Sequence, residues 1–157
     1  MVQVPDQVQI DYLILANHVE VRDSLLFISG GGWTDLYRVV VDGLPAPSTH
    51  IGIGVSIAIP WTETNKEQYL TIQLEDEDAT IMMKGEINIT QGRPAHLTPG
   101  TEQHAVIALP LDITFPREGS YRVVASLANG IVHRWSFHVH NQNASGQLMS
   151  GQAPKTV

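Results

Sequence analysis

The chain has 157 residues, of which 43% are hydrophobic and 16% charged, and its formal net charge is −7. This size and composition predict one globular domain, and the acidic balance with no basic run argues against a nucleic-acid or membrane partner. The absence of cysteine excludes disulfides and thiolate chemistry. With an N-terminal stretch unlike a signal peptide and no apolar run of ~20 residues, we expect a cytoplasmic protein.

Apolar and polar residues alternate in a series of short segments, which is the pattern of β-strands. The first segment covers residues 8–16, and the second, residues 25–28, runs into three glycines followed by Trp33. Glycine within a strand pattern marks a bend or a close approach of another backbone, because it reaches positive φ without a steric penalty. We therefore expect residues 30–33 to form a hinge between two strands.

Residues 51–59 show the clearest alternation in the chain. Their β-branched row predicts a strand that faces the core; its members are Ile51, Ile53, Val55, Ile57 and Ile59. The opposite row holds only small residues: Gly52, Gly54, Ser56 and Ala58. This row is either a solvent face or a surface on which something large lies flat, and the aromatic candidates are Trp33 and Trp61.

The middle of the chain predicts a short helical turn and then a hairpin. Thr64 and Glu67 have the spacing of a capping box, so one helical turn is expected at residues 62–67. Residues 70–74 and 81–89 alternate on either side of an acidic turn and predict an antiparallel pair. That acidic turn is too small to supply the six or more oxygens of a calcium site.

The last third of the chain predicts three more strands. After a loop at residues 91–103, an apolar row covers residues 105–115, and a hairpin follows around Asn129-Gly130, whose residues tolerate a type I′ turn. Tyr121, close after Gly119, has the position of a tyrosine corner. Residues 141–157 lack periodicity, and we expect them to form a flexible tail.

Eight or nine short strands with almost no helix predict an all-β fold, an antiparallel β-sandwich. An immunoglobulin-like topology is the first choice, and a jelly-roll or C2-like arrangement is the alternative. One sandwich domain is expected over residues 1–140.

His138 and His140 are the candidate metal ligands. Two positions apart on a strand, they share one face, and they could bind zinc or nickel if an acid or another histidine approached from a neighbouring strand. Arg134 on the same face disfavours a cation, and an exposed polar edge is the simpler interpretation. No nucleophile elbow, phosphate-binding loop or other catalytic motif is present. We therefore expect no enzymatic activity and no cofactor.

The candidate binding residues surround two tryptophans, Trp33 and Trp61, each of which follows a break in the strand pattern. Glu63 and Asn65 follow Trp61 in the same stretch and complete the set. Exposed tryptophans at loop ends are typical anchors of recognition, but large aromatic residues more often cap the ends of a core.

Several motifs together resemble a family of small bacterial proteins, chiefly actinobacterial, known only as a domain of unknown function. They include Gly-Gly-Gly-Trp at residues 30–33, Pro-Trp-x-Glu-Thr-Asn at residues 60–65 and Gly-x-Tyr-Arg-Val at residues 119–123. The resemblance covers about residues 8–140. It implies a bacterial, cytoplasmic, mostly β protein and supplies no activity or site residue.

The leading hypothesis is a non-enzymatic module that presents a sandwich end or an edge strand to a protein partner or to another copy of itself. The alternative is a small-ligand or metal-binding protein that uses His138 and His140 or the small-residue face of the 51–59 strand. A hydrolase acting through aspartate or glutamate and histidine comes third.

Overall fold

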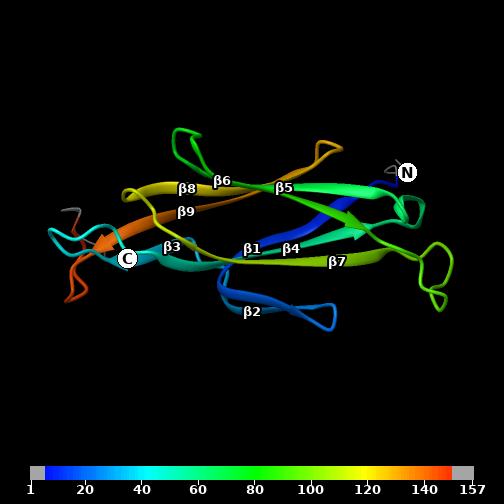
Figure 1. The fold of residues 1–157 in the computed structure, drawn as a ribbon, viewed down its shortest axis with the longest axis horizontal. Coiled ribbons are helices and arrows are strands. Elements are labelled where there is room, and N and C mark those ends of the chain that lie inside the picture. Colours follow the sequence, from blue (N-terminus) through cyan, green and yellow to red (C-terminus); the bar gives the residue numbers. More distant parts are fainter. Residues whose placement is uncertain (1–5, 150–157) are drawn as a thin grey trace, which may run out of the picture.

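The computed structural model describes residues 6–149, and most of them lie in nine strands (Figure 1). The strands are β1 (Gln9–Arg22), β2 (Leu25–Gly31), β3 (Asp35–Val39), β4 (Thr49–Ile59), β5 (Glu67–Asp76), β6 (Ile81–Thr90), β7 (Gln103–Ile113), β8 (Gly119–Leu127) and β9 (Val132–Gln142). The short 3₁₀ helix η1 (Trp61–Glu63) joins β4 to β5. Within this described part of the chain, no helix is long and apolar enough to cross a membrane.

The strands form two sheets that pack face to face, so the predicted sandwich is confirmed. Their orders are β2-β1-β4-β7 and β3-β9-β8-β5-β6. The pairing of β4 with β7, and of β8 with β5 on one side and β9 on the other, is the B–E and C–F–G pairing of an immunoglobulin-like sandwich. One pair departs from the expected antiparallel arrangement, because β3 lies parallel to β9. The glycine hinge carries the chain from β2 in the first sheet to β3 in the second, where β3 enters beside β9 in the same direction.

The core lies between the sheets and follows the predicted rows. All five residues of the row from Ile51 to Ile59 in β4 are fully buried, and so are Leu70, Ile72 and Leu74 of β5. At one end of the sandwich, the rings of Phe115, Tyr121 and Phe137 pack against one another at centroid distances of 4.8 to 5.9 Å. The Tyr121 hydroxyl donates to the Arg117 carbonyl oxygen at 2.6 Å, which is the predicted tyrosine corner. Burial raises the pKa of Tyr121.

The hairpin turn at Asn129-Gly130 differs from its expected type. Between β8 and β9, Gly130 has φ of +94°, whereas Asn129 does not have positive φ. The turn is therefore a three-residue loop that ends in a glycine bulge, and the Asn129 side chain accepts a hydrogen bond from the Ile131 amide. The two-residue turn with positive φ at both positions lies instead between β1 and β2, at Asp23 (+51°) and Ser24 (+60°).

The glycine-lined face of β4 is covered, but neither tryptophan covers it. β1 pairs with β4 over residues 9–16, then turns and pairs with β2 over residues 16–22. The hairpin lies on the outer side of the first sheet, away from the second (Figure 1). Val19 is fully buried there, and a Cβ atom at Gly52 would lie only 2.8 Å from the Val19 amide nitrogen. The small residues of β4 therefore make room for the backbone of β1 itself.

The predicted helical turn exists but begins earlier than expected. η1 covers Trp61–Glu63 rather than residues 62–67, and the capping box is not formed. The Thr64 hydroxyl donates back to the Trp61 carbonyl oxygen at 2.7 Å. Glu67 already begins β5, because it pairs with Thr90 of β6.

The C-terminal strand extends past the expected domain boundary. β9 continues to Gln142, because β3 pairs with it over residues 138–142. The Met149 amide donates to the Asn141 carbonyl oxygen at 3.0 Å. The rest of the expected tail, residues 150–157, lies outside the described residues.

Candidate functional site

Trp33 lies against the aromatic end of the core. Its ring packs edge-on against Phe137 at 5.6 Å, and its carbonyl oxygen accepts a hydrogen bond from Trp135 Nε1 at 3.0 Å. Its own Nε1 is buried and has no hydrogen-bond partner among the described residues. Trp33 therefore caps this end of the sandwich, and its indole N–H is not offered to a ligand at the surface.

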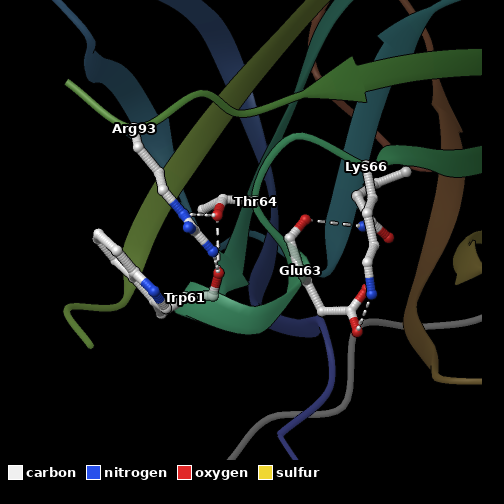
Figure 2. Close-up of polar contacts among 6 residues, drawn as sticks. Trp61, Glu63, Thr64, Lys66 and Arg93 are labelled. Carbon is white, nitrogen blue, oxygen red and sulfur yellow. Dashed lines mark hydrogen bonds and ion pairs between the residues drawn. The ribbon is translucent and has the colours of Figure 1, made fainter. Parts of the chain in front are cut away.

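Trp61 lies at the opposite end, before the first residue of β5, and one face of its ring is already occupied (Figure 2). The guanidinium of Arg93 lies 4.1 Å above the ring centroid, a cation–π contact. Arg93 also donates to the Trp61 carbonyl oxygen at 2.8 Å and to the Thr64 hydroxyl at 2.5 Å. These bonds fix the connection between β4 and β5.

Glu63 and Asn65 lie in the same connection as Trp61. Glu63 faces Lys66 at 3.5 Å in an exposed ion pair (Figure 2). Asn65 is exposed, has φ of +62° and donates its amide to the Gln91 carbonyl oxygen at 2.7 Å. The structure therefore brings Trp61, Glu63 and Asn65 together, and separates them from Trp33 by the length of the sandwich.

His138 and His140 share one face of β9, as predicted, and an acid does approach them from a neighbouring strand. Asp35 of β3 lies opposite His138 in the parallel register, and His140 Nε2 lies 2.7 Å from Asp35 Oδ1. On the other side, His138 Nδ1 lies 3.3 Å from the Ser120 hydroxyl. Tyr37 stacks on the His140 ring at 4.8 Å.

This row borders a cleft of about 400 Å³ whose other polar lining includes Arg122 and Glu77. Among residues 6–149, no three histidine, aspartate or glutamate side chains are arranged to hold a metal ion. His50 and His104 lie on the first sheet and do not join the row. The geometry is that of a hydrogen-bonded polar row.

The Asp35–His140 contact should make the free energy of unfolding depend on pH in the acidic range. The hydrogen bond from His140 is the largest cause that lowers the pKa of Asp35 below its ordinary value of 3.8. A lowered carboxyl pKa stabilises the fold above that ordinary value, and this contribution is lost as the pH falls through the lowered pKa. Urea unfolding should therefore show Asp35→Asn less stable than wild type at pH 7, with the difference shrinking as the pH falls below 3.8. A difference that stays constant over this range would contradict the assignment.

A further polar cluster arises from a bulge in β1 that sequence reasoning missed. The register of β1 on β4 shifts between Ile10 and Tyr12, so that Asp11 and Tyr12 are both exposed. Bulges redirect side chains in this way and are frequent beside functional sites. The signal was present in the sequence, because the buried row passes from Val8 and Ile10 to Leu13 and Leu15, a change from even to odd positions.

Asp11 is the centre of this cluster. Its Oδ2 atom accepts a hydrogen bond from the Ser56 hydroxyl at 2.8 Å and lies 2.6 Å from His104 Nδ1. His104 Nε2 faces Glu102 at 3.5 Å. Serine and histidine thus meet the same carboxylate oxygen, and the imidazole is not placed to take the proton of Ser56. The cluster presents a carboxylate rather than an activated nucleophile.

The Asp11 cluster closes one end of a groove beside β2. The groove has a volume of about 630 Å³, and its lining includes Asp11, Tyr12, Ser56, His104 and Val106 together with the start of β2. Residues 16–22 of β1, which pair with β2, do not line it. The groove therefore follows the side of β2 on which no second strand from residues 6–149 is paired.

Comparison with known proteins shows to which family the chain belongs. No curated protein matches the chain. Among solved structures, a β-glucosidase from Listeria innocua in complex with gluconolactone is similar at 9% identity and a TM-score of 0.43, over 87% of this chain and 16% of that chain. The sequence model of a family of unknown function, DUF6941, matches residues 11–140. The chain therefore belongs to the DUF6941 family.

Proposed function

We propose that this protein is a non-enzymatic interaction module that binds an extended segment of a protein partner along the free edge of β2. Strand addition of this kind draws its affinity from main-chain hydrogen bonds and its specificity from pockets for alternate side chains. The observation that carries the proposal is the unprotected edge of β2 with a groove beside it. The absence of cysteine supports a cytoplasmic setting, and the family resemblance supports a bacterial one.

The four edge strands of the two sheets differ in the features that prevent a further strand from pairing with them. β7 contains Pro110, which lacks a donor, and β6 contains the charged residues Lys84 and Glu86. β3 is only five residues long and contains two charged residues. β2 has neither proline nor charge over Leu25–Gly31. Because natural sheets protect their edges by these devices, an edge without them is best explained by a strand that pairs with it.

The register of the β1–β2 hairpin shows which groups β2 offers. A two-residue turn closes on a hydrogen-bonded pair, here Arg22 with Leu25. Alternation along the strand then directs the N–H and C=O groups of Leu26 and Ile28 away from β1. An added strand would pair with these groups.

The test uses a capped heptapeptide of alternating valine and threonine as a probe strand. In ¹⁵N-labelled protein, we expect its largest amide shifts over Leu25–Gly31, with saturable binding. Ile28→Pro removes one outward N–H at a position where an edge strand tolerates proline, and should weaken binding about tenfold or more. Ile28→Val, which keeps the N–H, is the matched control and should bind as wild type does.

Two outcomes would contradict the proposal. One is an absence of shifts along β2 at millimolar peptide, and the other is equal binding by the proline and valine variants. The same variants show whether the partner is a second copy. A dimer seen by light scattering that Ile28→Pro dissociates and Ile28→Val keeps would show two β2 strands pairing about a two-fold axis.

A further inference from the structure

Resting on the proposed function, the geometry points to the chemistry of the bound segment: we infer that it carries a lysine or arginine that pairs with Asp11, next to apolar side chains that contact Tyr12 and the start of β2. Asp11 thereby becomes the residue that selects the partner.

The Asp11 carboxylate is held in place and only partly satisfied. The bulge in β1 turns Asp11 to the outer face, where Ser56, itself buried, and His104 both bond to Oδ2. No hydrogen bond to Oδ1 is found among residues 6–149. The side chain is 26% exposed and lines the groove, so the carboxylate is fixed, partly desolvated and accessible from the groove. A charged donor gains most from an acceptor of this kind.

The surroundings of the groove favour a cation. Glu102 lies beside His104, and Glu20 and Asp23 lie in the hairpin that borders the groove. The nearby cation is Arg22, which is paired with Glu20 at 3.0 Å and lies 4.6 Å from the centroid of the Phe27 ring. With a formal charge of −7 on the whole chain, a basic segment is attracted and an acidic one is repelled.

The other walls of the groove are apolar. Tyr12, Leu25 and Phe27 line it and are 40%, 61% and 44% exposed. Alternate side chains of a strand point to the same face. A segment with apolar residues two positions away from a basic one would therefore cover these side chains with its apolar residues, while its cation reaches Asp11.

The inference is tested with three capped heptapeptides that share valine at positions 1 and 5 and threonine at the even positions. Positions 3 and 7 are both lysine, both threonine or both glutamate, so that the varied residues and the valines lie on one face of the strand. We expect the lysine peptide to bind wild type about five- to tenfold more tightly than the threonine peptide, and the glutamate peptide to bind most weakly. Asp11→Asn keeps an oxygen for Ser56 and His104 and should remove most of the preference for lysine.

Asp42→Asn, in an exposed loop away from the groove, is the control that makes the same change of charge, and it should keep the preference. Thermal melts establish that both variants are folded. If all three peptides bind wild type equally, or if both asparagine variants lose the preference alike, the role of Asp11 is wrong while strand addition stands. If no peptide binds β2, the proposed function itself fails.

Discussion

Replacing Gly52 with valine is expected to lower the free energy of unfolding by about 3 kcal/mol, at the upper end of the usual cost of overpacking. A Cβ atom at this position would lie 2.8 Å from the Val19 amide nitrogen and 3.0 Å from the His18 carbonyl carbon. Both are backbone atoms, so no rotamer change relieves the contact, and the β1–β2 hairpin must lift from β4. Urea unfolding followed by circular dichroism measures the loss.

Gly85→Val is the matched control for this prediction. Gly85 lies in β6, its φ is not positive, and a Cβ atom there would meet nothing within 4 Å. Valine should be tolerated or slightly stabilising at this position, because it favours an extended backbone. If Gly52→Val unfolded at the same urea concentration as wild type, the hairpin would not lie on β4, and the groove beside β2 would not exist as described.

Replacing Arg38 with methionine is expected to cost about 2–3 kcal/mol. Arg38 is 6% exposed, and its guanidinium donates to Asn141 Oδ1 at 2.7 Å and to the Phe115 carbonyl oxygen at 2.5 Å. These bonds connect β3, the end of β9 and the segment after β7. Methionine fills a similar volume but leaves both acceptors buried without a donor.

Two further variants separate the hydrogen bonds of Arg38 from its charge. Arg38→Lys keeps the charge but lacks the planar fork that reaches both acceptors, so it should recover only part of the loss. Arg134→Met removes an exposed cation of β9 and should leave stability within about 0.5 kcal/mol of wild type. Equal stability of Arg38→Met and Arg134→Met would show that the buried bonds do not contribute.

The sequence predicted the rows that face the core, because the alternation of apolar and polar residues with a period of two indicates which side of a strand is buried. It also predicted the tyrosine corner at Tyr121. It did not predict the bulge at Asp11, because the rows on either side of a bulge each look regular and only their phase changes. The candidate site likewise combines features that the sequence predicted with features that it did not. The sequence placed His138 and His140 on one face. Asp35 reached His140, and Ser56 and His104 reached Asp11, only through pairings that link distant parts of the chain.

Residues 30–33 also show what the sequence could and could not predict. Its glycines predicted a hinge, and a hinge is what joins β2 to β3, with positive φ at Gly30 and Gly32. Trp33 was one of two candidates to cover the glycine-lined face of β4, and it packs instead on Phe137 in the other sheet, where it caps one end of the core. A glycine within a strand pattern indicates that another part of the chain comes close, but it does not indicate which part.

By itself, the sequence determined that this chain forms a β-sandwich, which rows of its strands face the core and where glycines bend the chain between two strands. These properties depend on local alternation and on the conformational freedom of single residues. Only the tertiary structure decided that β1 folds back over β4, that β3 runs parallel to β9 and that β2 is left with a free edge beside Asp11. Those outcomes depend on which strands pair across long stretches of chain, and side-chain alternation is the same whichever neighbour a strand takes.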